Sequence, residues 1–111
     1  MNIIHKNDGA KIPYTIRGSK ITFDDEGMYN LTKYERDEAS HIDLCRDKFG
    51  NLVSGVIPGT AERYVAQIDI PARRYDYVPD GVDADGNPKQ KQVAVPLDME
   101  RVTLTLWSVE G

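Results

Sequence analysis

The stretch Arg63-Tyr64-Val65-Ala66-Gln67-Ile68-Asp69-Ile70-Pro71 decides the fold, because apolar and polar side chains alternate along it. Alternation with a period of two residues is the pattern of a strand that buries one side. Pro71 has no backbone N–H to donate, so the strand is expected to end there or to lie at a sheet edge. The pattern places Tyr64, Ala66, Ile68 and Ile70 on one face and Arg63, Val65, Gln67 and Asp69 on the other.

The same alternation returns near the C-terminus, at residues 102–107. Val102, Leu104 and Leu106 alternate with Thr103, Thr105 and Trp107. β-branched and aromatic residues pack well on a pleated surface, so this segment is also predicted to be a strand.

Shorter alternating stretches fill most of the remaining chain, separated by turn residues. Residues 7–9 are a turn signal, residues 47–51 are expected to be the loop of a β-hairpin, and Pro13 predicts an edge position for its strand. Helical periodicity is weak: the best candidate, 33–39, lacks an apolar stripe, and only a short turn is expected at 98–100. The other expected strands are 2–5, 12–16, 21–23, 29–34, 41–46, 52–57, 73–78 and 92–95, with a loop at 58–60.

These elements predict a mainly β protein with about eight to ten short strands and little helix. We expect a single domain over residues 1–111, built as an antiparallel β-sandwich or a small barrel. The longest polar insertion, 79–91, is rich in Gly, Asp and Pro. It is therefore expected to be a mobile hairpin loop.

Composition excludes several classes of protein. The chain has 111 residues, of which 40% are hydrophobic and 29% charged, which argues against disorder. No apolar run approaches the ~18 residues of a membrane-spanning helix. The net charge of −4 makes a nucleic-acid partner unfavourable, because such binding depends on neutralising phosphates. One cysteine and no apolar leader fit a reducing, cytoplasmic setting.

Neither a metal nor a cofactor is expected. Residues 83–87, Asp-Ala-Asp-Gly-Asn, resemble part of a calcium loop. With Gly86 at the sixth position, however, Gly81 and Gln92 fall where an aspartate and a bidentate glutamate belong. The segment is better explained as a hairpin tip. One cysteine and two histidines also fall short of a zinc site.

His41, Asp43 and Cys45 are the parts of a thiol-nucleophile site, and strand alternation places them on one face. Side chains two residues apart on a strand lie ~6–7 Å from each other, beyond hydrogen-bond reach. Ile42 and Leu44 form the natural core face, so the trio is expected to be exposed or at an interface. No catalytic residue is predicted.

Tyrosine outnumbers phenylalanine six to two. Tyr75 and Tyr77 are predicted to share a strand face beside Arg73, and Trp107 ends the last strand. Arg, Tyr and Trp are the residues that protein interfaces favour, so these four are the candidate interface residues. The alternative is ordinary packing, because aromatic residues favour strands in any case.

Two parts of the sequence resemble small prophage-encoded proteins of Gram-positive bacteria. They are residues 63–73 and the segment Val95-Pro96-Leu97-Asp98 leading into 102–107. The resemblance implies a virion or tail accessory subunit, or a host-interaction protein, and it transfers no functional residue.

The leading interpretation is a non-enzymatic assembly component that binds protein partners or itself as a homo-oligomer, in the bacterial cytoplasm or the virion. A sugar- or peptide-binding β module is one alternative. A small enzyme with a site assembled across strands is another.

Overall fold

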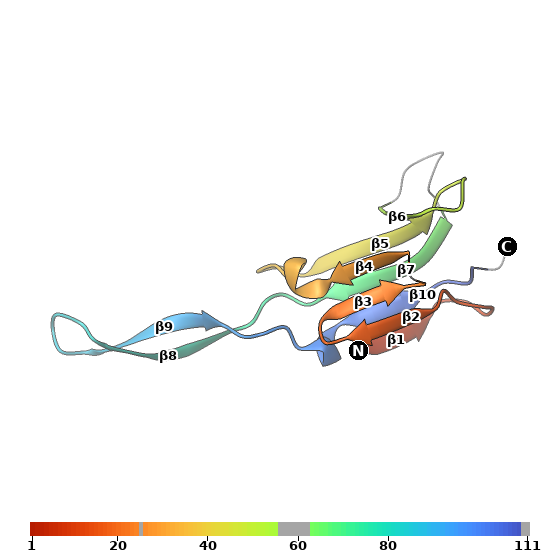
Figure 1. The fold of residues 1–111 in the computed structure, drawn as a ribbon. Coiled ribbons are helices and arrows are strands. Elements are labelled where there is room, and N and C mark those ends of the chain that lie inside the picture. Colours follow the sequence, from red (N-terminus) through yellow and green to blue (C-terminus); the bar gives the residue numbers. More distant parts are fainter. Residues whose placement is uncertain (25, 56–62, 110–111) are drawn as a thin grey trace.

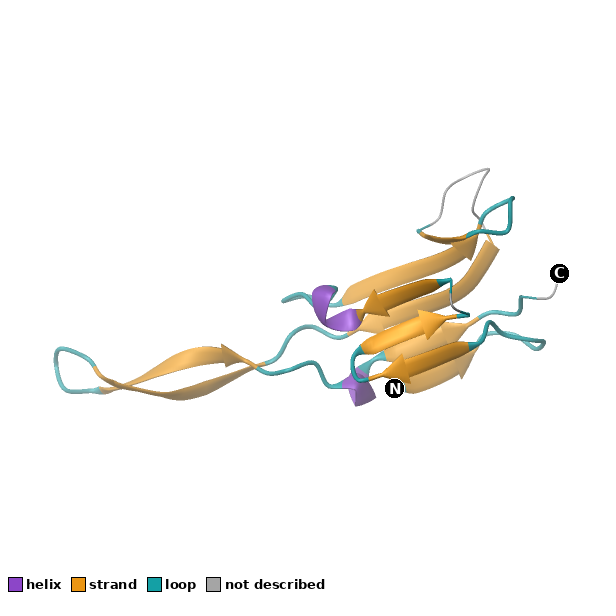
Figure 2. Cartoon of the chain, in the orientation of Figure 1, coloured by secondary structure: helices purple, strands orange, loops and turns teal. Residues whose placement is uncertain are grey.

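The computed structural model describes residues 1–24, 26–55 and 63–109, and in these the chain is mainly β (Figure 1). They form ten strands in three sheets, with two single-turn 3-10 helices. None of these sheets closes into a barrel, so the sandwich is the architecture found. Figure 2 shows two layers of strands and one thin hairpin that leaves them.

The larger sheet has the strand order β1-β10-β7-β5-β6, and β7 is its middle strand. β1 runs parallel to β10, and the other pairs are antiparallel. The expectation that this strand ends at Pro71 is confirmed: β7 ends at Ile70, directly before the proline, and lies in the middle of the sheet. The bounds are β1 Asn2–His5, β10 Thr103–Leu106, β7 Arg63–Ile70, β5 Ser40–Arg46 and β6 Leu52–Ser54.

The smaller sheet is an antiparallel meander of β2 (Tyr14–Arg17), β3 (Lys20–Phe23) and β4 (Gly27–Asn30). β2 follows Pro13 and is an edge strand, as predicted. The expected strand 29–34 stops at Asn30, whose side chain accepts a hydrogen bond from Thr32 N–H and begins the 3-10 helix η1 (Leu31–Lys33). No helix forms over 33–39.

Contacts at β4 fix how the two sheets face each other. The Tyr29 hydroxyl lies 3.2 Å from Oγ of Ser54, the last residue of β6. Arg46 Nη1 donates a 2.7 Å hydrogen bond to Glu26 Oε1. Because β4 covers the β5–β6 side, β2 at the other end of its sheet lies toward β10 and β1 (Figure 1).

The core lies between these two sheets. Register pairs Ile68 with both Leu104 and Ile42, so three neighbouring strands place buried apolar side chains in one row. Ile21 and Phe23 face them from the smaller sheet, as their alternation predicted, and both are fully buried. The remaining core residues are Ile12, Leu31, Leu44, Val65, Ala66, Ile70, Val102 and Leu106.

A β-bulge interrupts the alternation of β7. Leu44 pairs with Ala66 and the next residue, Cys45, pairs with Tyr64, so Val65 has no partner across β5. An extra residue in one strand moves the residues beyond it to the opposite face. The predicted shared face of Tyr64 and Ala66 is therefore wrong: Val65 is buried, and Tyr64 stacks on Trp107.

The third sheet is a hairpin of β8 (Tyr75–Val82) and β9 (Pro88–Ala94) that projects from the sandwich; we call it the arm (Figure 1). It joins β7 to its antiparallel neighbour β10, so it replaces a short turn. The molecule measures 67 × 25 × 22 Å with a radius of gyration of 18.9 Å. A compact domain of this length would have about 13 Å.

The structure corrects the expectation that residues 79–91 form a hairpin loop. Residues 79–82 and 88–91 are strand, and the loop is limited to 83–87. Its mobility stays a prediction. The strands expected at 73–78 and 92–95 are correspondingly longer.

Three smaller expectations complete the comparison. The turn at 98–100 is the 3-10 helix η2 (Met99–Arg101). The expected strand 52–57 is observed to Ser54, and residues 56–57 and the loop at 58–60 lie outside the described residues. No helix in the described part of the chain is long and apolar enough to cross a membrane.

The core and the arm should differ sharply in their tolerance of truncation. Leu104→Ala should lower the free energy of unfolding by about 2–5 kcal/mol, because it leaves a cavity in the central row. Val82→Ala on the exposed arm should change it by less than about 0.5 kcal/mol. Urea denaturation monitored by circular dichroism measures both, and similar values would contradict this division.

Candidate functional site

The arm carries one face without charged residues. Opposite residues of an antiparallel pair share a side, and alternate residues of a strand return to it. The register pairs Tyr75 with Ala94, Tyr77 with Gln92, Pro79 with Gln90 and, beyond a bulge, Val82 with Pro88. These eight residues lie on one side, which we call the uncharged face.

The opposite side of the arm is charged. Asp76 pairs with Val93, and Val78 pairs with Lys91. Lys89 lies two residues before Lys91 and therefore on the same side. The ribbon is therefore amphipathic, like a strand pair that covers a core on one side. No described segment of this chain covers the uncharged face beyond the arm's base, since all of β9 and most of β8 are exposed.

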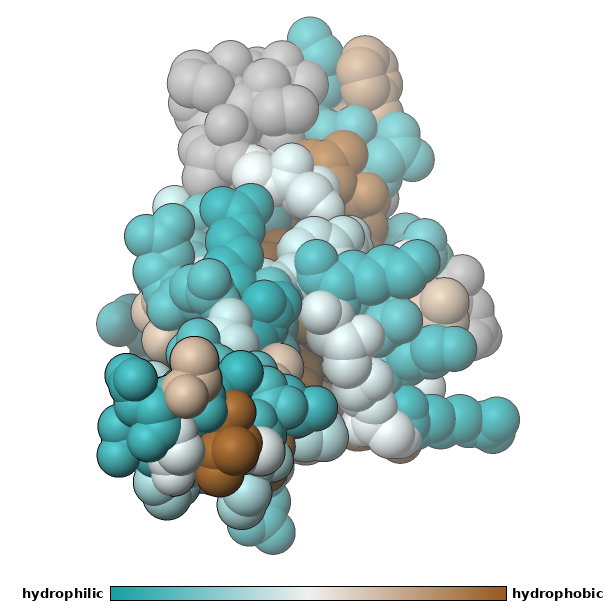
Figure 3. Space-filling model, turned by 90° about the vertical axis from the view of Figure 1, so that its left-hand side faces the viewer, coloured by the Kyte–Doolittle hydropathy of each residue, from teal (hydrophilic) through white to brown (hydrophobic). Residues whose placement is uncertain are grey.

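The apolar side chains of the uncharged face are open to solvent. Tyr77 is 65% exposed and Val82 is 63% exposed. Figure 3 views the molecule from the arm's end, where a small hydrophobic patch stands among hydrophilic atoms. An isolated two-stranded hairpin is at best marginally stable in water, so an exposed amphipathic ribbon gains stability from any partner that covers it.

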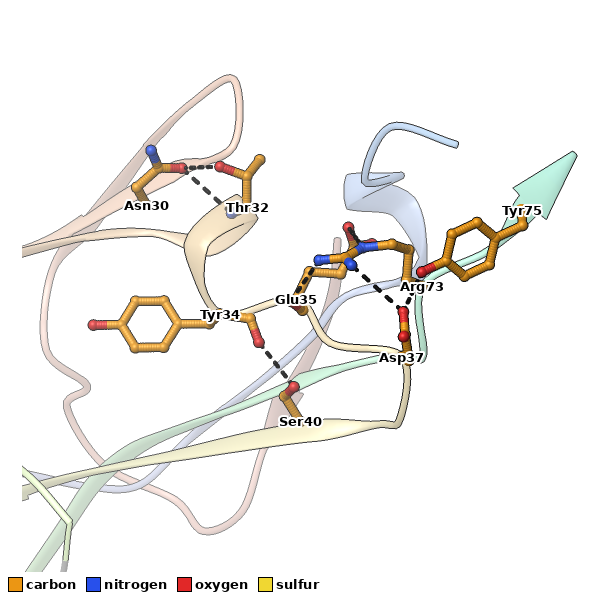
Figure 4. A network of polar contacts seen from close by, with 8 residues as sticks. All are labelled: Asn30, Thr32, Tyr34, Glu35, Asp37, Ser40, Arg73 and Tyr75. Carbon is orange, nitrogen blue, oxygen red and sulfur yellow. Dashed lines mark hydrogen bonds and ion pairs between the residues drawn. The ribbon is translucent and has the colours of Figure 1, made fainter. Parts of the chain in front are cut away.

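Polar contacts hold the base of the arm to the segment that follows η1 (Figure 4). Arg73 Nη2 donates to the Glu35 carbonyl oxygen at 3.0 Å, and the Arg73 backbone N–H donates to Arg36 at 2.7 Å. Arg73 also pairs with the Glu35 and Asp37 carboxylates, each at 3.4 Å. The Tyr75 hydroxyl donates to the Asp37 carboxylate. We call this set the basal clamp.

The basal clamp explains the position of two candidate interface residues. Arg73 lies before β8, not within it, and its guanidinium turns toward residues 35–37. The pKa of Arg73 is raised by the Tyr75 hydroxyl and by Glu35. Arg73 and Tyr75 therefore orient the arm, whereas Tyr77 is left exposed on the uncharged face.

The arm's tip repeats a turn found elsewhere in the chain. Asp83 Oδ1 accepts hydrogen bonds from the N–H groups of Asp85 and Asn87, both at 2.9 Å. Asp47 does the same for Phe49 and Asn51. Gly86 and Gly50 adopt φ of 81° and 84°, which glycine accepts without strain. The Asp-x-x-Gly-Asn sequence thus accounts for both turns through backbone hydrogen bonds.

The outer face of the larger sheet carries a second polar cluster. His41 Nδ1 lies 2.5 Å from Asp69 Oδ1, and His41 Nε2 lies 2.6 Å from Asp43 Oδ1. Gln67 Nε2 donates to Asp43 at 3.0 Å. The expectation that His41 and Asp43 stay out of hydrogen-bond range is wrong, because the imidazole bends along the strand to reach the carboxylate.

Two carboxylates favour the protonated form of this histidine. The hydrogen bond to Asp69 raises the pKa of His41, and the one to Asp43 adds to the effect. Burial works against ionisation of Asp43, but hydrogen bonds from Gln67 and His41 lower its pKa overall. With both ring nitrogens engaged, His41 has no free lone pair with which to act as a general base.

Cys45 does not join this cluster. The expectation that it is exposed or at an interface is wrong, because its side chain is fully buried opposite Tyr64. Burial raises the pKa of the Cys45 thiol, and the negative charge of Asp43 raises it further. A nucleophilic cysteine needs the opposite shift.

Trp107, the fourth candidate interface residue, directly follows β10, whose opposite end is the one connected to the arm. Its ring stacks on Tyr64 with centroids 5.3 Å apart, and Lys6 Nζ lies 5.8 Å from the ring centroid. Its indole N–H donates to Gln67 at 3.0 Å. The contacts that a ligand would use are thus made by the protein itself.

A hollow of about 320 Å³ lies beside the base of the arm. It is lined by Arg74, Tyr75, Asp76 and Val95. Its size is at the lower end of small-molecule sites. Within residues 1–24, 26–55 and 63–109, no three acidic, histidine or cysteine side chains are placed to hold a metal ion.

The four candidate residues thus fall into two places, with Arg73, Tyr75 and Tyr77 on or beside the arm and Trp107 far from it. Sequence reasoning missed the partners of these residues, Asp37 and Gln67, because both are distant in the chain. A role in binding stays a prediction for all four. Comparison with protein-family models, curated proteins and solved structures gave no match to this chain.

The two carboxylates should make His41 titrate above its ordinary pKa of ~6.5. Because the folded pKa is raised, the stabilisation is complete below about pH 6.5 and disappears as pH rises through the folded value. It should stay below about 1 kcal/mol, since the groups are half exposed. NMR titration of wild type, Asp69→Asn and Asp43→Asn should give the highest pKa in wild type. An ordinary or lowered pKa in wild type would contradict the geometry.

The basal clamp should control how firmly the arm is held. Arg73→Ala should accelerate amide hydrogen exchange in β8, because the arm loses its contacts with Glu35 and Asp37. Arg74→Ala is the matched control, because the neighbouring Arg74 makes only a 3.7 Å contact with Asp98. Exchange monitored by mass spectrometry decides the matter, and equal rates in both variants would speak against a clamp.

Proposed function

We propose that this chain is a non-enzymatic assembly component that joins a homo-oligomer through its arm. The observation that carries the proposal is the exposed two-stranded ribbon with an uncharged face. The core strands bury their apolar sides between two sheets, whereas the arm extends its apolar side into solvent. A neighbouring subunit would complete the missing layer.

Tyr77 and Val82 are the residues expected to anchor this contact. Tyrosine buries a large area while its hydroxyl keeps a polar partner, which favours it at interface centres. Truncating such an anchor costs about 2 kcal/mol or more, or roughly a thirtyfold loss of affinity. The basal clamp supports the role, since an arm held at a fixed angle loses less entropy on docking.

We further propose that the assembly is a phage or prophage structure and that this chain is one of its structural or accessory subunits, present in the virion or the host cytoplasm. The resemblance of residues 63–73 and 95–107 to prophage-encoded proteins supports this origin. The 67 Å length supports assembly, because it lets a small subunit reach a neighbour beyond its own sandwich.

A sugar- or peptide-binding module is the alternative that one observation favours. The hollow beside Arg74, Tyr75, Asp76 and Val95 has an aromatic wall and charged groups of both signs. It would compete with assembly for the base of the arm but would leave Tyr77 and Val82 unused. An enzyme would need a free base or nucleophile, and His41 and Cys45 are engaged or buried.

Two substitutions of the same kind on opposite faces of the arm test the proposal. Val82→Lys places a charge on the uncharged face and should dissociate the oligomer. Val93→Lys places the same charge on the charged face, at a site that is 41% exposed, and should leave the oligomer intact. Light scattering after size-exclusion chromatography measures the mass, with circular dichroism as the check of folding. Identical masses for wild type and both variants would contradict a role of the arm.

A further inference from the structure

We infer that the uncharged face of the arm docks into an open seam between β1 and β2 of a second copy of this chain. The inference rests on the proposed assembly function and names the partner surface. β1 is the edge of the larger sheet and β2 the edge of the smaller sheet, and both lie on the same side of the sandwich (Figure 1).

The seam exposes residues that face the core. Ile3 pairs with Leu104 and Ile16 pairs with Ile21, and both partners are fully buried between the sheets. Paired residues share a side, so Ile3 and Ile16 also point inward. Yet Ile3 is 37% exposed and Ile16 is 40% exposed. The two layers therefore do not close over their own apolar residues at this edge.

β1 is also an edge strand without the usual protection. Edge strands commonly carry lysine, proline or a bulge, which prevent pairing with other chains. Residues Asn2-Ile3-Ile4-His5 have none of these, and Ile4 is exposed as well. Two other edges are guarded, since β2 follows Pro13 and ends at Arg17 and β6 is only three residues long, whereas the edge strand β4 also lacks lysine and proline.

The arm of a second copy matches this seam in chemistry. Both surfaces are apolar and free of lysine, arginine and acidic side chains at their centres, so neither leaves a charge buried without a partner. Tyr77 and Val82 would cover the exposed side chains of Ile3 and Ile16. The arm projects away from the sandwich, held by the basal clamp, so it cannot reach the seam of its own chain (Figure 2).

An arm in a seam is a contact between two different surfaces. Each copy then offers one arm and one seam, and such heterologous contacts build rings or filaments instead of closed pairs. This property distinguishes docking of an arm into a seam from two other ways in which these surfaces could associate. Pairing of arm with arm, or of β1 with β1, would give a twofold dimer.

Mixing two defective chains tests the inference. Ile16→Lys should destroy the seam and keep the arm, while Val82→Lys should do the reverse, so each should be monomeric alone. Mixed in equal amounts, they should form one-to-one complexes and nothing larger. Met28→Lys, on the far edge strand of the same small sheet, is the control and should assemble like wild type. Ile3→Lys is a second seam variant in case Ile16→Lys fails to fold.

Sedimentation velocity of each chain and of the mixture reads out the result. Assembly that survives both seam variants but not Val82→Lys would overturn the seam and leave the arm's role standing. Assembly of the Val82→Lys chain alone would point to β1 pairing with β1 and overturn the inference. A wild-type chain that stays monomeric at high concentration would overturn the proposed homo-oligomer itself.

Discussion

The pairing of β7 with both β5 and β10 is the constraint on which the rest of the structure depends. It aligns Ile42, Ile68 and Leu104 in a single buried row, and the smaller sheet covers that row with Ile21 and Phe23. The same pairing sets the direction of the arm. Because β7 and β10 are antiparallel neighbours, the chain between them must leave and return at the same end of the sheet. A long connection there projects beyond the sandwich along its strands.

The bulge at Val65 is the second feature of β7 that shapes the structure. It places Val65 and Ala66 together in the core and moves Tyr64 to the outer face, where Tyr64 stacks on Trp107. The outer face then becomes a chain of polar contacts in which Trp107 binds Gln67, Gln67 binds Asp43, and Asp43 binds His41. Side chains that look like interface or catalytic residues in sequence are thereby used to hold neighbouring strands together.

The arm, by contrast, leaves its apolar side uncovered. Its residues have the alternation of a buried strand, but no second layer of the described chain covers them. Arg73 and Tyr75 are interface-type residues, but here they contact Glu35 and Asp37. These polar contacts fix the angle of the arm (Figure 4). Tyr77 and Val82 remain free for contact. The exposed apolar residues of β1 and β2 present the complementary situation, since there the core itself is left open.

The sequence by itself determined which segments are strands and where they turn, because period-two alternation and Gly, Asn, Asp and Pro act within a few residues. That local signal predicts the strand Arg63–Ile70, the strand near 103–106 and the mainly β class. The extent of the arm does not follow from the local signal, because Pro79, Gly81 and Pro88 are residues typical of loops. Only cross-strand pairing with a bulge shows that they lie in a ribbon.

The partners of the polar residues also needed the tertiary structure. His41 meets Asp69, and Arg73 meets Glu35, across separations that no local pattern encodes. The face that Tyr64 occupies depends on one extra residue in β7, and a shift of a single residue reverses the side of every side chain beyond it. Alternation is a property of one strand and can be read from sequence. Register is a property of two strands and is decided only when the whole core packs.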